Sequence, residues 1–166
     1  MKLTIRPIEA NDNKELADVI RKVFREFKID KSGTVYTDPT TDALYELFRQ
    51  GGSCYWVALC DENIVGGCGI FPTKGLPNGC AELVKLYLAK EVRGKGLGEI
   101  LMKKSIQWAV NYGYTQLYLE SFPELSQAIS LYTKLGFKTL KKPLGDSGHY
   151  ACNLWMCKKI DCAKTP

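Results

Sequence analysis

The chain has 166 residues, of which 45% are hydrophobic and 25% are charged, values typical of a soluble globular protein. This length suits one domain, and the composition excludes a disordered tail, a collagen-like repeat and a low-complexity scaffold. The 23 Lys and Arg residues against 18 Asp and Glu residues give a net charge of +5, which favours anionic ligands but does not by itself indicate nucleic-acid binding.

The first half of the chain predicts one strand, two helices and then three strands. Leu16, Ile20 and Val23 recur at the spacing of one helix face, and Gly51-Gly52 ends the second helix. Polar residues at 61–63 indicate a hairpin turn between two β-prone runs. The expected elements are a strand near residues 3–8, helices over residues 12–27 and 43–48, and strands over residues 54–59, 64–71 and 81–88.

The second half predicts helices that alternate with strands. A charged, glycine-rich segment at residues 90–98 leads into a helix that ends at Gly113, and a later helix begins near Pro123 and ends at Gly136. The expected elements are helices over residues 97–112 and 123–135, and strands over residues 115–120, 137–140 and 149–158. This order predicts an α/β fold, a mixed sheet flanked by helices, in a single domain spanning residues 1–166.

Cysteine usage indicates a reducing compartment. The seven cysteines are scattered, no two form a Cys-x-x-Cys pair, and His149 is the only histidine. We therefore expect reduced thiols and no metal site. No apolar run reaches the roughly 20 residues that cross a bilayer, and the N-terminus has no hydrophobic signal core, so we expect a cytoplasmic protein with no membrane contact.

The segment from Leu86 to Gly98 carries the main functional signal, because a strand leads into a tight loop and the loop into an amphipathic helix. Glycines let the backbone approach a ligand, and the free N–H groups of the first helical turn favour an anion. Arg93 and Lys95 add positive charge, so the loop is predicted to bind phosphate. Its glycine spacing fits neither a Walker loop nor a dinucleotide-binding fingerprint.

Residues Arg93 to Gly98 resemble the Arg/Gln-x-x-Gly-x-Gly/Ala loop with which GNAT-superfamily N-acetyltransferases hold the pyrophosphate of acetyl-CoA. Residues Ala128 to Phe137 resemble that family's Ala-x-x-Leu-Tyr-x-Lys/Arg-x-Gly-Phe segment, and the resemblance covers nearly the whole chain. It implies a GNAT-like fold, acetyl-CoA as cosubstrate, and a central strand that splays from its neighbour to admit the pantetheine arm. The cofactor-binding residues that it implies are Leu86, Tyr87, Leu88, Arg93, Gly94, Lys95, Gly96, Leu97 and Gly98.

The chain departs from the family pattern at one position. Many relatives carry an asparagine seven residues before the motif tyrosine, where it helps to hold the cofactor, and this chain has Leu125 there. An equivalent contact must come from elsewhere or be absent, and Ser126 and Ser130 are the nearby candidates.

N-acetylation needs a base, because an alkylamine with a pKa of about 10.4 is almost wholly protonated at neutral pH. Glu82 lies on the predicted central strand and matches a glutamate that is the base in some GNAT relatives. Half-burial there would raise its pKa and make it a better proton acceptor. The position also suits a glutamate that only binds a cationic substrate, or a solubilising charge. Glu120, near the end of the next strand, is expected to contact the substrate.

The departing thiolate needs a proton, and the developing oxyanion needs hydrogen-bond donors. The resemblance assigns the acid role to Tyr132, for which a core aromatic is the alternative, and the donor role to the backbone N–H groups of Leu86 to Leu88. His149 has no nucleophile beside it in the sequence and is expected at the surface or at a strand edge. Cys152 and Cys157 are expected to pack in the core.

These features predict a cytoplasmic N-acetyltransferase that moves the acetyl group of acetyl-CoA to a primary amine by direct attack in a ternary complex. A non-catalytic acyl-CoA-binding sensor is the alternative, and a nucleic-acid-binding domain is disfavoured because Lys and Arg form no clustered stripe. The acceptor, a small molecule or a protein amine, is not indicated by the sequence, and both a monomer and a homodimer are compatible with it. The loops expected to select the acceptor are residues 27–38, 72–79 and 143–148.

Overall fold

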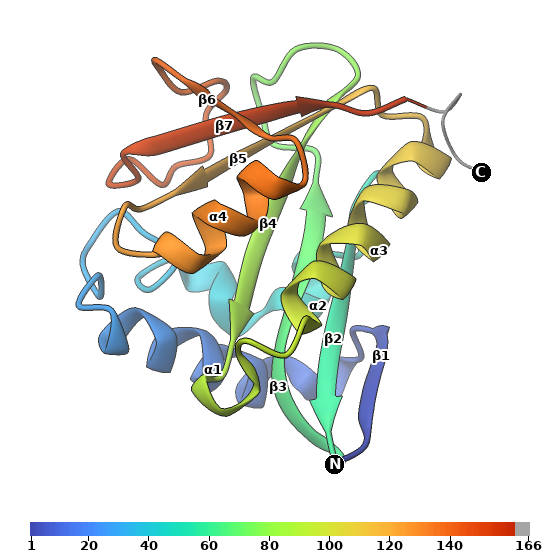
Figure 1. Ribbon diagram of the computed structural model, residues 1–166, viewed down its shortest axis with the longest axis vertical. Helices are drawn as coiled ribbons and strands as arrows, with labels where there is room; N and C mark the ends of the chain where they lie inside the picture. Colours follow the sequence, from blue (N-terminus) through green and yellow to red (C-terminus); the bar gives the residue numbers. More distant parts are fainter. Residues whose placement is uncertain (162–166) are drawn as a thin grey trace.

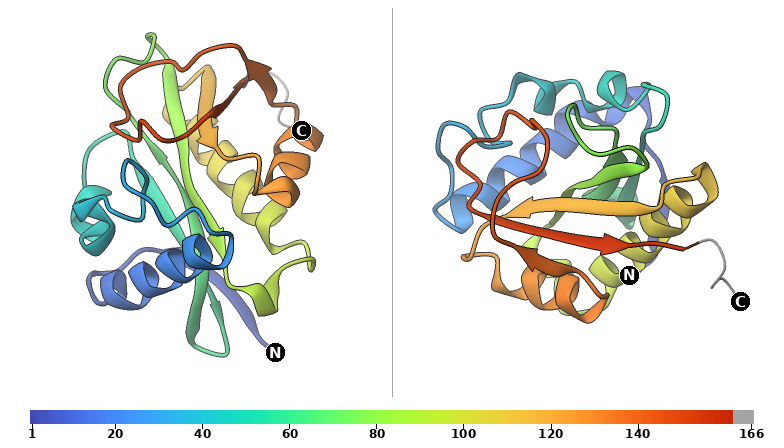
Figure 2. Two further views of the ribbon diagram at one scale, coloured as in Figure 1. Left: turned by 90° about the vertical axis from the view of Figure 1, so that its left-hand side faces the viewer. Right: turned by 90° about the horizontal axis from the view of Figure 1, so that it is seen from above.

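The computed structural model describes residues 1–161 and shows a seven-stranded sheet with helices on both faces (Figures 1 and 2). The strand order is β1-β2-β3-β4-β5-β7-β6, and all neighbours are antiparallel except β4 and β5. The strands are β1 Leu3–Pro7, β2 Cys54–Cys60, β3 Asn63–Phe71, β4 Cys80–Leu88, β5 Gln116–Ser121, β6 Lys138–Leu140 and β7 Leu154–Lys159. The helices are α1 Asn13–Glu26, α2 Leu44–Leu47, α3 Leu97–Tyr112 and α4 Ser126–Lys134.

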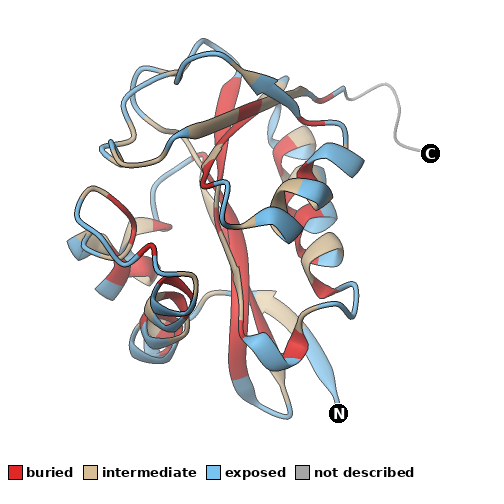
Figure 3. Cartoon of the chain, turned by 60° about the vertical axis from the view of Figure 1, so that its left-hand side comes forward, coloured by how far each residue is buried: buried red, intermediate tan, exposed pale blue. Residues whose placement is uncertain are grey.

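Each face of the sheet has its own buried apolar cluster. Helices α1 and α2 cover one face, where Leu16, Ile20 and Phe24 are fully buried. Helices α3 and α4 cover the other, where Leu101 and Met102 of α3 are fully buried. Figure 3 shows the buried residues concentrated along the central strands, which places β4 between the two layers. The mixed α/β fold predicted from the order of elements is confirmed.

Two predicted boundaries are wrong. Helix α4 begins at Ser126 rather than near Pro123, because residues 122–125 form a turn in which the N–H of Leu125 donates to the carbonyl of Phe122. The last strand begins at Leu154 rather than at His149. Residues 149–153 instead form a turn, and the N–H of Ala151 donates to the carbonyl oxygen of Gly33, 3.0 Å away.

Strand β4 contains a β-bulge at Lys85. Gly67 pairs with Tyr87 and Gly69 pairs with Val84, so β4 has one residue more than β3 between these pairs. Lys85 has a left-handed φ of 54°, and the Tyr55 hydroxyl donates to its carbonyl oxygen across 2.8 Å. A bulge reverses the alternation of side chains along a strand. In a regular strand, residues three positions apart point to opposite faces of the sheet. Because of the bulge, Lys85 and Glu82 instead line the same cavity.

The parallel ladder between β4 and β5 is short. It pairs Cys80 with Gln116, Ala81 with Leu117 and Glu82 with Tyr118, and it ends there. β5 continues to Ser121 beside β7, while β4 continues to Leu88 beside β3. Among the described residues, the edge of β4 that faces β5 therefore has no ladder partner after Glu82, which is the splayed arrangement that the resemblance implied.

Within residues 1–161, no helix combines the length and the apolar character that crossing a membrane requires. The six cysteines in this part of the chain are free thiols, and Cys162 lies outside the described residues.

Candidate active site

A groove of about 620 Å³ lies where β4 ends and α3 begins, with α1 and the start of α4 forming its other walls. Eight of the nine predicted cofactor-binding residues line it. Lys95 is the exception, because its Nζ donates to the carbonyl oxygen of Glu91 at 2.9 Å. The loop at residues 93–98 and the splayed end of β4 thus face one continuous space.

The loop can accept an anion at Gly94 and Gly96. Both have left-handed φ values, 72° and 81°, and a Cβ on either would meet no atom of residues 1–161 within 4 Å. Backbone conformation rather than crowding therefore requires glycine, and the space in front of the loop is open. Ile100 is the first α3 residue whose N–H donates within the helix, to Gly96, so the N–H groups of the preceding turn are available. These amides suit the diphosphate of a nucleotide-type ligand.

Arg93 anchors this loop to the rest of the fold. Its Nη1 lies 2.6 Å from Glu26 Oε1, and its Nε donates to the carbonyl oxygen of Leu88 at 2.9 Å. The guanidinium also lies 5.0 Å from the ring centroid of Phe27. Arg93 is therefore held by α1 and β4 rather than being a mobile cation, and its hydrogen bond to Glu26, together with its charge, lowers the pKa of that carboxyl. It still lines the groove, with its positive charge close to the open loop.

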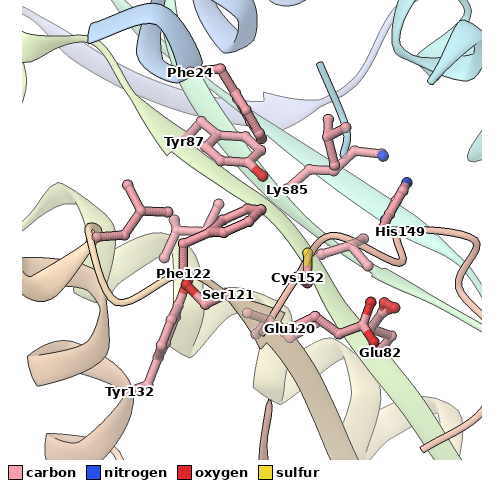
Figure 4. Close-up of a pocket in the computed structure, with 15 residues that line it drawn as sticks. Phe24, Glu82, Lys85, Tyr87, Glu120, Ser121, Phe122, Tyr132, His149 and Cys152 are labelled. Atoms are coloured by element: carbon pink, nitrogen blue, oxygen red, sulfur yellow. The ribbon is translucent and has the colours of Figure 1, made fainter. Parts of the chain in front are cut away.

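A smaller cavity of about 40 Å³ adjoins the groove on the side of α1 and residues 149–152 (Figure 4). Leu86, Tyr87 and Leu125 line both spaces, so the groove and the cavity meet at the end of β4. Leu125, which replaces the usual asparagine, thus contributes an apolar side chain to this junction. Of the two serines considered as substitutes, Ser126 lines the groove and Ser130 lines neither space.

Glu82 lines this cavity and is almost fully buried, with 3% of its surface exposed. Burial raises its pKa to about 8, and the neighbouring charge of Glu120 acts in the same direction. Lys85 and a hydrogen bond from the Thr73 hydroxyl, 3.3 Å from Oε1, oppose this shift. The expected direction is therefore found, although Glu82 is far more buried than the half-burial anticipated from the sequence.

Glu120 lies beside Glu82 and is held by two hydroxyl groups (Figure 4). Tyr118 donates to its Oε2 across 2.7 Å, and Ser147 donates to its Oε1. The N–H of Leu144 in turn donates to the Tyr118 hydroxyl at 3.2 Å. The segment at residues 143–148 is thereby attached to the end of β5, next to the cavity.

Tyr132 reaches the cavity from α4 and packs edge-on against Phe137, with ring centroids 6.1 Å apart. It is 5% exposed, and burial raises the pKa of its hydroxyl above the ordinary value of 10. The side chain therefore carries its proton at physiological pH. Among residues 1–161 its hydroxyl has no hydrogen-bond partner, which leaves it available to a ligand.

Sequence reasoning missed three polar residues of this cavity. Lys85 is only 8% exposed, and burial lowers the pKa of its ammonium group, against the opposing charges of Asp38 and Glu82. His149 is not at a strand edge, because it lies in the turn before β7. Its Nε2 lies 2.7 Å from Asp38 Oδ2. Ser121 has a buried hydroxyl with no partner among the described residues. The only sign of these residues in the sequence was Lys85, a charged residue within the largely apolar run of β4.

Comparisons with known proteins agree with this geometry. Residues 18–137 match the Acetyltransferase (GNAT) family. An uncharacterized N-acetyltransferase of Escherichia coli (strain K12), YjgM, is 37% identical over 158 residues, which cover 94% of each chain.

Two solved structures share the fold. A GNAT-family acetyltransferase from Staphylococcus aureus Mu50 has a TM-score of 0.84 at 22% identity, over 96% of this chain and all of the other. The PaiA N-acetyltransferase from Thermoplasma acidophilum, solved in complex with coenzyme A, has a TM-score of 0.75 at 21% identity, again over 96% and 100%. With the family match and the relative from Escherichia coli, this places the chain in the GNAT family of acetyl-CoA-dependent N-acetyltransferases.

Proposed function

We propose that this protein transfers the acetyl group of acetyl-CoA directly to a primary amine while both substrates are bound. The observation that carries the proposal is the junction at Leu86 and Tyr87, where an open groove lined by a glycine-rich loop meets a buried cavity. Glu82 and Tyr132 both line that cavity. Two spaces that meet at one point allow two substrates to react without a covalent enzyme intermediate.

The groove residues would hold acetyl-CoA, which supplies an acetyl group activated as a thioester. The amides of Gly94 to Gly98 and of the first turn of α3 suit the diphosphate. The unpaired edge of β4 from Leu86 to Leu88 supplies N–H and carbonyl groups for the extended arm, and N–H groups there are positioned to stabilise negative charge on the acetyl oxygen.

Glu82 is proposed as the base that takes the proton from the acceptor amine, directly or through water. A base works best when its pKa lies near the working pH, and burial brings that of Glu82 to about 8. Its proximity to Glu120 also gives the cavity an anionic end that favours the ammonium form of an incoming amine. Binding and deprotonation of the amine can thus occur at one place.

Tyr132 is proposed as the acid that protonates the thiolate leaving group. Its buried hydroxyl keeps its proton at physiological pH and has no competing partner in the described part of the chain. It approaches from α4, and Glu82 approaches from β4 (Figure 4). The acid and the base therefore enter the cavity from different elements.

The cytoplasm is proposed as the location of the protein. The free thiols at residues 1–161 support a reducing compartment of this kind.

The test is release of free thiol from acetyl-CoA across a panel of primary amines, followed by the Glu82→Gln variant. General-base catalysis contributes about 10²–10⁴-fold, so we expect kcat/KM to fall by at least about 100-fold. The wild-type rate should rise with pH to a plateau above about 8, and this rise should disappear in the variant. Glu62→Gln, an exposed exchange in the β2–β3 turn, is the matched control. An unaltered pH profile in Glu82→Gln would assign the base role elsewhere, and no thiol release with any amine would favour a binding protein.

A further inference from the structure

The cavity has an acidic end and a basic end. Glu82 and Glu120 lie together at the first, while the nitrogen atoms of Lys85 and His149 occupy the second (Figure 4). Most of the remaining lining is apolar and includes Phe24 and Val35. Separated charges of opposite sign inside a small apolar space are costly unless a ligand completes them.

The ammonium group of Lys85 has no partner among the described residues, on a side chain that is 8% exposed. No hydrogen bond or ion pair reaches its Nζ from any residue between 1 and 161. Asp38 is the nearest candidate by charge, but its carboxylate is already used. Its Oδ2 lies 2.7 Å from His149, and its Oδ1 accepts hydrogen bonds from the N–H and the hydroxyl of Thr40, at 2.9 and 2.7 Å. One buried cation is therefore left facing the cavity.

The backbone at Lys85 has an unusual left-handed conformation. The left-handed conformation is unfavourable for a residue other than glycine, and the hydrogen bond from the Tyr55 hydroxyl to the Lys85 carbonyl oxygen stabilises it here. The bulge puts Lys85 beside Glu82 in a space where a regular strand would send them to opposite faces. Strain of this kind is characteristic of functional sites.

We propose that the acceptor amine also carries a carboxylate, as a free α-amino acid does, and that Lys85 binds this carboxylate while the amine faces Glu82 and Glu120. The inference rests on the proposed acetyl transfer and names its substrate class. Ser121 also lines the cavity, and its buried hydroxyl has no partner among the described residues. The ammonium and carboxylate groups of a zwitterion would match the two ends of the cavity.

The cover of the cavity favours a small acceptor over a protein. Two segments close it: the contact of His149 with Asp38 joins residues 141–153 to residues 27–38, as does the bond from Ala151 to Gly33. A lysine side chain of a protein carries no carboxylate beside its amine, so it would leave Lys85 without a partner.

The first test compares matched acceptors in the thiol-release assay with wild-type protein. Each L-α-amino acid is set against its carboxamide and its decarboxylated amine, for example alanine against alaninamide and ethylamine. Because a hydrogen bond between charged groups is strong when buried, we expect kcat/KM for at least one amino acid to exceed that of its amide by about tenfold or more. Equal turnover of acids, amides and amines would overturn the inference while leaving acetyl transfer in place.

The second test removes the cation and keeps the side-chain length. In Lys85→Met, the preference for the acid over the amide should fall towards one, whereas Lys14→Met, an exposed exchange on α1, should keep it. Calorimetric titration of the preferred amino acid into protein saturated with CoA gives a readout without turnover, and its affinity should fall by the same factor. Lys85→Arg, which keeps the charge, should bind the amino acid better than Lys85→Met.

The outcomes separate the two proposals. Thiol release that is retained with an unchanged acid preference in Lys85→Met would refute the role of Lys85. A Lys85→Met protein that does not fold, judged by lost CoA binding, leaves the wild-type acid-to-amide ratio and the Lys85→Arg titration to decide. Absence of thiol release with every amine, together with absence of amino-acid binding, would overturn both proposals.

Discussion

Replacing Glu82 by Gln should stabilise the fold at neutral and alkaline pH, even though it removes the proposed base. The carboxyl has a pKa of about 8 in the folded protein against an ordinary value of 4.5. Because the folded pKa is the higher one, the stability contributed by this group is complete below about pH 4.5 and is lost as the pH rises towards 8. The amide of the variant has no charge to desolvate, and its oxygen can still accept the hydrogen bond from Thr73.

The size of the effect follows from the two pKa values. Each pH unit between them corresponds to about 1.36 kcal/mol in the free energy of unfolding. At pH 7 the pH lies 7 − 4.5 = 2.5 units above the ordinary pKa, so Glu82 lowers the free energy of unfolding of the wild type by about 3 kcal/mol relative to acid conditions. Well above pH 8 the full difference between the two pKa values, 8 − 4.5 = 3.5 units, applies, and the loss reaches about 5 kcal/mol.

Urea denaturation at pH 4, 7 and 9 measures this difference directly. The variant should match the wild type at pH 4 and exceed its free energy of unfolding by about 3 kcal/mol at pH 7. Glu62→Gln, which is exposed, should show no such trend with pH. A Glu82→Gln variant that is less stable at pH 7, or displaced by the same amount at all three pH values, would refute the claim that Glu82 is held in a desolvated site.

Two further predictions concern the groove and the acid. Gly96→Asp should abolish acetyl-CoA binding in calorimetric titration, because a side chain and a negative charge would enter the open space at the loop; Gly113→Asp is the control, since Gly113 also has a left-handed φ and open space but lies at the far end of α3. Unchanged affinity in Gly96→Asp would contradict the assignment of the loop. Tyr132→Phe should lower kcat by about 10²-fold while keeping acetyl-CoA affinity, and equal rates in rapid-mixing assays would eliminate the acid role.

The fold and the groove between the end of β4 and α3 could be predicted because their signals are local in the sequence. Helical periodicity at Leu16 to Phe24 and the glycines between Arg93 and Gly98 determine short segments without reference to distant residues. The left-handed φ of Gly94 and Gly96 is a property that the residue type itself indicates.

The smaller cavity could not be predicted in the same way, because it is built from residues that are distant in the sequence. Asp38 and His149 are separated by 111 positions, and the turn that carries His149 depends on a hydrogen bond to Gly33. The alternation along β4 gives no sign of the bulge at Lys85, which exists only in the pairing with β3. The depth of burial at Glu82 likewise depends on what β5 and the later loops place around it.

The short β4–β5 ladder has a mechanical consequence. Four strands on one side and three on the other are joined through three residue pairs at one end of β4, so the sheet is a wedge that is closed at one end only. A molecule bound at the open end would contact both halves of the sheet at the place where residues 1–161 form no ladder between β4 and β5. The melting temperature should therefore rise with the fraction of protein that has a ligand bound in the wedge, so that the two halves of the sheet are joined along their full length only in the ligand-bound enzyme.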